Sequence, residues 1–600
     1  MRRTLKPFLA IYIVLAISLC LSAPLASSPA LQENHPFEVK VEKNAEASMR
    51  DGVKLYADIY RPNITEKAPV ILIRTPYNKE SYGSYSSFPK YAAQRGYAVI
   101  VQDVRGRFSS RGEFVPYLQE LNDGYDSVEW AAGLPFSSGK VGLEGCSYLG
   151  AVQWQAAVMN PPHLVAIFPQ CTFANGRHFF FFSGTWDLSW IVWLNGRLPD
   201  IKRHRGIMGI NASERQAGRE WEDHKWEWLS FLPLKNFPLL KEFCPYYYDW
   251  LSHPDDGPYW DFVNVEKRHS EVSVPAYNFT GWFDDGYGQP GATRNFLGMR
   301  KNGKTPQARD GQKLLIGPWT HCEPTSSAAS VDYGQDAAVN VDELAVRWFD
   351  YWLKGIDNGI MEEPPIKIFV MGENKWRTET EWPPARAQKT SLYLSGTGAA
   401  NSLYGQGKLT EQLPPSGSHD HYTYDPANPV TDYFFEEPGP RDFRPIEVRS
   451  DVLVYTSELL KKDIEVTGEI QAELWASSSA KDTDFVVKVA DVSPSGFSQS
   501  ITPPLSGILR ARYRESEAAP VLLTPGKIYK LTIDSMYTSY VFRSGHKIRV
   551  WISSSYFPHF DRNPNTGHPL GEDTEIVQAN QTIYHDKKFP SRIILPIIPK

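Results

Sequence analysis

The sequence has few cysteines and no second long apolar run. Its 600 residues contain five cysteines, and none of them belongs to a CxxC motif or to a Cys/His pattern with zinc-ligand spacing. We therefore expect no disulfide framework, no bound metal and no cofactor. A net charge of −6 gives no electrostatic reason to bind nucleic acid or anionic lipid. The expected partner is a small molecule or a short peptide, and the oligomeric state stays open.

The one long apolar stretch lies at the N-terminus. Arg2, Arg3 and Lys6 precede an apolar run over residues 8–21, and small residues and prolines follow it. This order is typical of an export signal, so we expect residues 1–30 to be a signal peptide and the mature protein to be periplasmic or secreted. An uncleaved membrane anchor is the alternative, because no clean cleavage site follows the run. Once the signal is removed, no membrane contact is expected.

The most informative segment is KVGLEGCSYLG at residues 140–150, which places Ser147 between an apolar strand and a helix. Glycines at Gly145 and Gly150 let strand and helix approach closely at a sharp turn, and many hydrolases present a nucleophile in this way. The amide of Tyr148 would begin the helix and donate to an oxyanion in the same space. The usual pattern is GxSxG, and here the second glycine comes one place later. The motif alone therefore does not distinguish a nucleophile from a Gly/Ser turn.

A serine nucleophile needs a histidine to take its proton and a carboxylate to orient that histidine. In α/β hydrolases the carboxylate and then the histidine follow the serine in the chain, each in a loop after a sheet strand. Asp284 follows the strand-like run 274–279, and His321 follows the run 313–316. The segment between them is long enough for one helix and one parallel strand. We therefore expect these two strands to be neighbours, although an isolated Asp or His in such a position is usually structural.

Together these motifs resemble one family of hydrolases. GCSYLG, GWFD and GPWTH, with RTPYNK at residues 74–79 and QDVRG at residues 102–106, are similar to the bacterial cocaine esterase and X-Pro dipeptidyl-peptidase (CocE/NonD) family of serine hydrolases. DTDF at residues 482–485 and DRNPNTG at residues 561–567 extend the resemblance to the last part of the chain. Nearly the whole mature chain is covered.

The resemblance implies a role for each candidate residue. Ser147 would be the nucleophile, His321 the general base and then acid, and Asp284 the carboxylate that orients the imidazole. The phenol of Tyr77 and the amide of Tyr148 would form the oxyanion hole.

Two alternatives at this site stay open. Asp285 is a second candidate for the orienting carboxylate, although the GWxD pattern of the family aligns Asp284. Cys146 and Cys322 adjoin the proposed serine and histidine, so a cysteine nucleophile is conceivable. At the variable position of the turn Cys146 is expected to point inward, and both cysteines are interpreted as small buried residues.

The order of strands and helices predicts an α/β fold, namely an α/β-hydrolase domain with an inserted helical cap, followed by a C-terminal β-sandwich. Apolar strands alternate with helical stretches over residues 31–174 and 271–384, as in a parallel sheet. Residues 175–270 are dense in aromatic residues and are interpreted as the cap. Residues 385–600 contain turns and alternating strands, and the last domain of the family is a jelly roll.

Trp186, Trp190 and Trp193 stand at helical spacing within the predicted cap. Such spacing usually indicates a packing face. If the cap covers Ser147, some of these rings would instead line an acyl or aromatic pocket. The sequence does not assign which rings do so.

The preferred function is an exported serine hydrolase that cleaves an ester or acyl-amide bond of a small molecule or peptide through a Ser147 acyl-enzyme. Within the family, an X-Pro dipeptidyl-peptidase is the alternative. Amino-acid ester hydrolases resembling this chain carry two acids where Gly286 and Tyr287 stand, which disfavours amino-ester substrates. A noncatalytic protein that holds a hydrophobic or saccharide ligand is the alternative of another class.

Overall fold

The computed structural model describes residues 37–207, 209, 214–284, 288–414, 418–437 and 439–599. The predicted signal peptide, the alternative carboxylate Asp285, and Gly286 and Tyr287 lie outside the described residues. Within the described part of the chain, no helix combines the length and the apolar composition that a membrane crossing requires.

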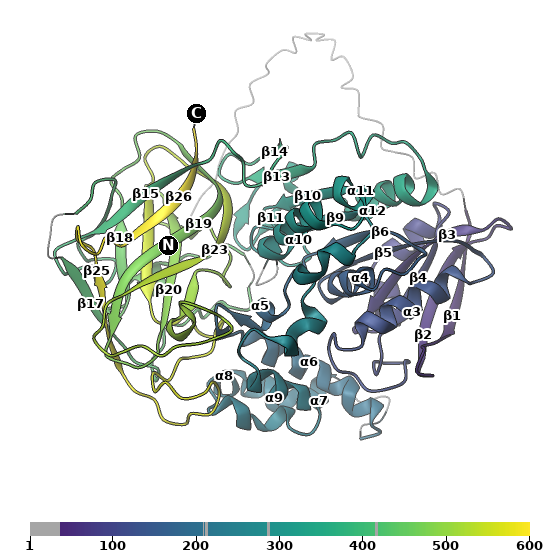
Figure 1. Ribbon diagram of the computed structural model, residues 1–600, viewed down its shortest axis with the longest axis horizontal. Helices are drawn as coiled ribbons and strands as arrows, with labels where there is room; N and C mark the ends of the chain where they lie inside the picture. Colours follow the sequence, from purple (N-terminus) through teal and green to yellow (C-terminus); the bar gives the residue numbers. More distant parts are fainter. Residues whose placement is uncertain are drawn as a thin grey trace, which may run out of the picture. The chain divides into compact units, whose positions relative to one another are not determined.

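A ten-stranded sheet organises the first part of the chain (Figure 1). Its strands, in spatial order, are β1 (Val39–Ser48), β2 (Lys54–Pro62), β4 (Ala98–Asp103), β3 (Ala68–Thr75), β5 (Ser137–Cys146), β6 (Leu164–Gln170), β9 (Ala276–Gly281), β10 (Gln312–Gly317), β13 (Ile366–Val370) and β14 (Lys375–Glu379). All neighbours from β4 to β13 are parallel. The predicted pairing of the strands that precede Asp284 and His321 is confirmed, because β9 and β10 lie side by side in register.

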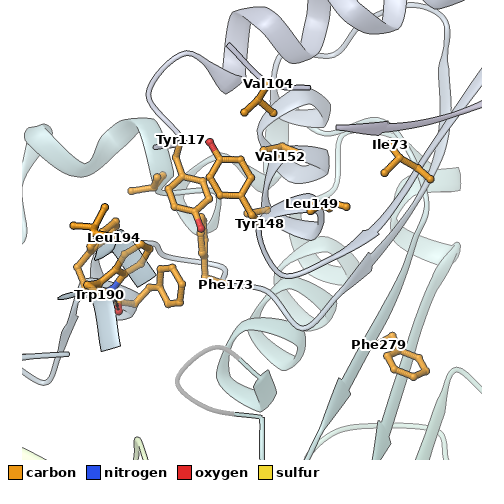
Figure 2. Packing of buried hydrophobic residues seen from close by; sticks show 14 of the residues in the cluster. Ile73, Val104, Tyr117, Tyr148, Leu149, Val152, Phe173, Trp190, Leu194 and Phe279 are labelled. Atoms are coloured by element: carbon orange, nitrogen blue, oxygen red, sulfur yellow. Dashed lines mark hydrogen bonds between the residues drawn. The ribbon is translucent and has the colours of Figure 1, made fainter. Parts of the chain in front are cut away.

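Helices pack against this sheet, and its central strands are buried along their whole length, as in parallel sheets covered on both faces. The helices are α1 (Lys79–Tyr85), α2 (Phe88–Ala93), α3 (Glu120–Ala132), α4 (Tyr148–Val158), α10 (Gly288–Asn302), α11 (Pro306–Asp310) and α12 (Val341–Phe349), which continues as a π-helix over Asp350–Lys354. Figure 2 shows part of the core, with Leu149 and Val152 of α4 beside Val104 and Ile73 of the sheet region. This packing fixes the start of α4, where Ser147 lies.

A mainly helical segment is inserted between β6 and β9. It contains α5 (Arg177–Phe180), β7 (Phe181–Phe182), β8 (Thr185–Trp186), α6 (Ser189–His204), α7 (Glu214–Asp223), α8 (Lys225–Leu229), α9 (Pro245–Ser252) and short 3₁₀ turns at Leu234–Asn236, Pro238–Leu240, Pro258–Val263 and Glu266–Glu271. The helical interpretation of Trp190 and Trp193 is confirmed, since both lie in α6, but that of Trp186 is wrong. Ser183 and Gly184 adopt positive φ angles of 47° and 83°, so the chain turns back into the hairpin β7–β8 before the helix begins.

The last part of the chain forms a largely antiparallel β-sandwich (Figure 1). Its strands are β15 (Gln388–Ser395), β16 (Gly407–Thr410), β17 (His419–Tyr424), β18 (Leu453–Thr456), β19 (Ile464–Ser478), β20 (Asp484–Val492), β21 (Ser498–Ser500), β22 (Ile508–Arg510), β23 (Tyr529–Phe542), β24 (Lys547–Ser553), β25 (Ala579–Tyr584) and β26 (Arg592–Ile598). The helix α13 (Arg444–Glu447) and a 3₁₀ turn at Ala511–Tyr513 also lie in this part of the chain. A separate two-stranded sheet of β11 (Ser327–Ala328) and β12 (Val331–Asp332), with a 3₁₀ turn at Gln335–Ala337, precedes β13 in the sequence. The predicted alternation holds in β19, where Val466, Ile470 and Leu474 are buried.

The core of this sandwich is continuous with the end of the hydrolase sheet. Ile368 in β13 and Met371, which directly follows that strand, belong to the same apolar cluster as Ile470 and Met536. Met371 also forms a backbone bridge with Tyr540 of β23. The sandwich is therefore packed directly on the sheet. The residue limits proposed for the separate domains stay a prediction.

Candidate active site

Ser147 occupies a strained turn between β5 and α4, with φ 65° and ψ −123°. A serine rarely adopts a positive φ, and such strain persists only where the surrounding structure imposes it. A Cβ atom on Gly145 would lie 2.5 Å from Cβ of Leu149, and one on Gly150 would lie 2.6 Å from the carbonyl oxygen of Gln170. The glycine that departs from the usual motif spacing is therefore required where α4 crosses the end of β6.

The two partners predicted for the serine lie together. Asp284 follows β9, His321 follows β10, and Asp284 Oδ1 is 2.6 Å from His321 Nδ1. Asp284 is buried, and its Oδ2 accepts a hydrogen bond from Thr280 Oγ1 at 2.9 Å. A buried carboxylate held in this way fixes the imidazole with its proton on Nδ1, so that Nε2 is the ring nitrogen that can act as a base.

Ser147 and His321 line the same cavity, whose volume is about 1020 Å³. Tyr77 lines it too, just beyond the end of β3. Its phenol oxygen accepts a hydrogen bond from Trp193 Nε1 at 3.2 Å, and the guanidinium of Arg197 lies 4.9 Å from the centre of its ring. These contacts hold the phenol at the wall of the cavity that contains the serine.

Tyr148 contributes to this region through its backbone. Its amide is the first of α4, and amides in the first turn of a helix have no acceptor within that helix. Its ring lies against that of Tyr117, as Figure 2 shows. The two rings are stacked, with centres 4.3 Å apart. The phenol donates to Glu120 Oε1 at 2.9 Å and accepts from the Tyr117 amide at 3.0 Å. The side chain thus anchors the helix start while the amide remains available to a substrate.

Aromatic residues of the inserted segment form one wall of the cavity, and the structure assigns the rings that the sequence left open. Trp190 and Trp193 of α6 line it, with ring centres 5.5 Å apart, together with Phe179 and Trp221 of the same segment. Tyr117, which precedes α3, adds another ring to the cavity lining. Trp186 does not line it and instead packs in the interior. The C-terminal sandwich supplies further wall residues. These are Phe435, Glu436, Leu505, Pro558 and His559.

Glu144 is a polar wall residue that the sequence interpretation missed. It lies in β5 just before the turn, is only 5% exposed, and accepts hydrogen bonds from Gln170 Nε2 at 2.7 Å and Tyr82 Oη at 3.5 Å. Among the described residues, no Lys, Arg or His forms a salt bridge with it. Burial, reinforced by the nearby charge of Asp342, raises the pKa of Glu144 to about 8. The only signal in the sequence was an acid within an otherwise apolar and glycine-rich strand.

Cys146 and Cys322 form a disulfide across the site, with Cα atoms 6.1 Å apart. Both cysteines are only partly buried and line the cavity, so the interpretation of them as small buried residues, with Cys146 pointing inward, is wrong. The turn at Ser147 brings the end of β5 toward the loop after β10, and no local sequence pattern reports that long-range approach. A disulfide sulfur carries no thiolate, so Cys146 in this state is not a nucleophile.

A third cysteine lies beside this bridge. Cys171, directly after β6, is buried, and its sulfur accepts a hydrogen bond from the Cys322 amide at 3.4 Å. Potential ligand atoms of Cys171, Asp284 and His321 lie within 4.8 Å of one another. A metal bound there would have to replace the hydrogen bond between Asp284 and His321, so this group fits acid–base chemistry better than metal binding.

Comparisons with known proteins show the family to which the chain belongs. Residues 51–323 match the family described as X-Pro dipeptidyl-peptidase (S15 family), and residues 358–594 match the X-Pro dipeptidyl-peptidase C-terminal non-catalytic domain. The chain is 35% identical to the cocaine esterase of a Rhodococcus species over 591 residues, which cover 93% of this chain and 99% of the relative. The chain belongs to this family of cocaine esterases and S15 peptidases. It is a serine hydrolase that acts on small molecules or peptides.

Solved structures support the same fold. An α-amino acid ester hydrolase superposes with a TM-score of 0.79 at 25% identity and covers 96% of this chain and 99% of its own. A CocE/NonD family hydrolase from Staphylococcus aureus superposes with a TM-score of 0.67 at 19% identity and covers 94% of both chains. The fold class, an α/β-hydrolase with a C-terminal β-sandwich, is confirmed.

Proposed function

We propose that this protein is an exported hydrolase that cleaves an ester or acyl-amide bond through an acyl-enzyme on Ser147. The observation that carries the proposal is the 2.6 Å contact between Asp284 and His321 at the cavity that Ser147 also lines. A strained serine, an oriented imidazole and a buried carboxylate are the groups that nucleophilic acyl transfer needs.

In the proposed mechanism, His321 takes the proton of Ser147 as its oxygen attacks the substrate carbonyl. The Tyr77 phenol and the Tyr148 amide donate to the oxyanion of the tetrahedral intermediate. His321 then gives the proton to the leaving group, and it next activates the water that releases the acid from the serine. Asp284 stabilises the imidazolium formed in both halves of the reaction.

Several features favour an ester or acyl amide as the substrate. The Trp190 and Trp193 rings give the cavity an apolar wall suited to an aromatic or acyl group. The Rhodococcus relative is named a cocaine esterase, and the S15 family is named for X-Pro dipeptidyl-peptidases, which keeps dipeptide release as the second candidate. Gly286 and Tyr287 supply no acid to hold a free α-ammonium group, so amino-acid esters rank lower.

Export is proposed from the basic and apolar N-terminal segment, with removal of residues 1–30. The Cys146–Cys322 disulfide favours the same location, because disulfides persist in oxidising compartments and are rare in the cytosol. Neither a cofactor nor a metal is part of the proposed reaction.

A fluorophosphonate probe tests the nucleophile directly. We expect it to label the wild-type protein, and we expect Ser147→Ala to abolish labelling and to lower kcat by several orders of magnitude. Ser189→Ala is the matched control, since Ser189 is an exposed serine that lines the same cavity, and it should keep both labelling and turnover. Full turnover by Ser147→Ala would refute the assignment. Ligand binding without labelling of the wild type would favour the noncatalytic alternative.

The same preparation then distinguishes the substrate classes. We expect aryl esters and acyl amides to be hydrolysed with higher kcat/KM than X-Pro anilides. Preferential release of X-Pro dipeptides would assign the protein to the peptidase branch of the family.

A further inference from the structure

We propose that the Cys146–Cys322 disulfide is a positioning element of the active site, and that full turnover requires its oxidised form. This inference rests on the proposed roles of Ser147 and His321. Cys146 immediately precedes the serine, and Cys322 immediately follows the histidine. The bridge therefore links the backbone next to Ser147 with the backbone next to His321, and a proton must pass between the side chains of these two residues.

The sheet itself does not connect these two loops directly. Ser147 follows β5 and His321 follows β10, and β6 and β9 lie between these strands. Each loop is instead held to the strand or loop beside it. The Ser147 amide donates to the Gln170 carbonyl at 2.9 Å, and His321 contacts Asp284 at 2.6 Å. The disulfide is the covalent connection that spans the gap.

Both ends of the bridge lie in backbone that needs external support. Ser147 has a φ of 65° and Cys322 a φ of 61°, a region that residues other than glycine adopt at a cost in free energy. Acyl transfer depends steeply on the separation of nucleophile and base, and a misplacement of about 1 Å can lower a rate by about 10²-fold. A link that holds both loops should therefore act on kcat more than on substrate binding.

The bridge is within reach of small reductants. Both cysteines line the substrate cavity and are only partly buried. Burial, with the charge of Asp284, raises the pKa of the neighbouring Cys171 well above its usual value, so this thiol stays protonated and is a poor attacking group. The bridge is thus open to an added dithiol but protected from exchange with its buried neighbour.

A dithiol supplies the electrons and protons that are needed to open the Cys146–Cys322 bridge. One thiolate of dithiothreitol attacks a sulfur of the bridge and releases the other as a cysteine thiolate, which takes up a proton. The second thiol of the reagent then displaces the remaining cysteine and closes a cyclic disulfide. The protein gains two electrons and two protons, and the reagent loses them.

The test compares the folded enzyme before reduction, after reduction and after reoxidation, on one aryl ester. We expect reduction to lower kcat by about ten- to a hundredfold while KM changes by less than about threefold. Reoxidation with diamide should restore kcat. Circular dichroism and a thiol count establish that the reduced protein is folded and that the bridge is open. Unchanged kcat in protein with a demonstrably open bridge would overturn the proposal.

Variants separate this bridge from the other sulfur groups. Cys146→Ser combined with Cys322→Ser should turn over at the reduced rate and ignore the reductant. Cys244→Ser, which removes a buried free thiol of the inserted segment, should keep the wild-type rate and the full response to reduction. If the double variant does not fold, the reversible response of the wild type still decides the question. Loss of activity in Ser147→Ala with no effect of reduction would refute the positioning role while sustaining the proposed nucleophile.

Discussion

The hydrolase sheet and the C-terminal sandwich each contain a short contact between a histidine and an aspartate. In the sheet His321 Nδ1 lies 2.6 Å from Asp284, and in the sandwich His585 Nε2 lies 2.6 Å from Asp420. The side chain of His321 is 30% exposed in a cavity that also holds a serine, whereas His585 and Asp420 are fully enclosed. The same pair of groups can therefore serve proton transfer or stability, and access to a nucleophile makes the difference.

The surroundings of the two carboxylates follow this division. Asp420 accepts hydrogen bonds from His585, from the Ala400 amide at 2.9 Å and from Tyr455 Oη at 2.8 Å. Burial alone would raise the pKa of Asp420, but these hydrogen bonds lower it below its ordinary value. The hydrogen bonds that Asp420 accepts thus all come from groups within the folded sandwich. In His321, by contrast, Nε2 is the ring nitrogen that takes the serine proton in the proposed mechanism.

Asp284→Asn should produce the largest effect of the set. An asparagine cannot hold the imidazole in the tautomer that accepts the serine proton, so we expect kcat to fall by about 10³–10⁴-fold on the precedent of serine-protease triads. The melting temperature should change little by comparison. Steady-state kinetics on an aryl ester and a thermal melt provide the two readouts, and a loss of less than tenfold in kcat would remove Asp284 from the proposed triad.

Asp420→Asn should give the opposite pattern. An asparagine loses the charge and puts an NH2 donor in place of one acceptor oxygen, so the donors of His585, Tyr455 and Ala400 can no longer all be paired. We expect the free energy of unfolding at pH 7 to fall by about 3–5 kcal/mol. Because the pKa of Asp420 is lowered in the folded state, its stabilisation is present above the unfolded pKa of about 4 and is lost as the pH falls through the folded value. Denaturant melts between pH 3 and 7 measure this. A variant with normal stability and reduced kcat would contradict the contrast between the two pairs.

Two tyrosines extend the comparison to hydroxyl donors. Tyr77→Phe removes a proposed oxyanion donor and should lower kcat by about 10²–10³-fold with little change in stability. Tyr455→Phe is its counterpart in the sandwich. It removes one hydrogen bond to Asp420 and should lower the free energy of unfolding by about 1–3 kcal/mol while kcat stays within twofold. Equal kinetic effects of the two substitutions would remove the special role of Tyr77.

Substitution of Glu144 gives the smallest expected effect. The contribution of Glu144 to the free energy of unfolding depends on pH in the opposite sense to that of Asp420. Because the pKa of Glu144 is raised to about 8, the free energy of unfolding should fall as the pH rises from about 4 through 8. Glu144→Gln abolishes this decrease and should be more stable than the wild type at pH 9 by about 1–3 kcal/mol. Glu222→Gln, at an exposed acid that lines the same cavity, is the control and should follow the wild type. Parallel curves for all three proteins would contradict the assignment.

The sequence predicts those parts of the site that depend on local patterns. Strand-like runs before Asp284 and His321 indicated two neighbouring parallel strands, because alternating strands and helices leave few topologies. The glycines around Ser147 indicated its turn for a similar reason. The disulfide was not predictable, since Cys146 and Cys322 are 176 residues apart in the chain and meet only after the sheet is assembled.

Burial and tight turns account for the remaining differences. Helical spacing suggested one helix for Trp186 and Trp190, but the turn at Gly184 interrupts it. The sequence did not predict the burial of Glu144, because an acidic residue in a strand usually faces solvent. Its hydrogen-bond partners Tyr82 and Gln170 belong to other elements. Such features depend on what packs around a residue, which a single sequence does not report.

The wall residues from the sandwich matter for re-engineering this enzyme. Leu505, Pro558 and His559 border the space that holds Ser147, although they belong to the region matched by a domain described as non-catalytic. The term non-catalytic says that the domain supplies no reacting group, but its residues still help to shape the cavity. A mutagenesis library confined to the first 384 positions would leave out part of the cavity wall that selects substrates. Replacing the sandwich with that of a homologous enzyme is a second way to change which molecules enter the cavity.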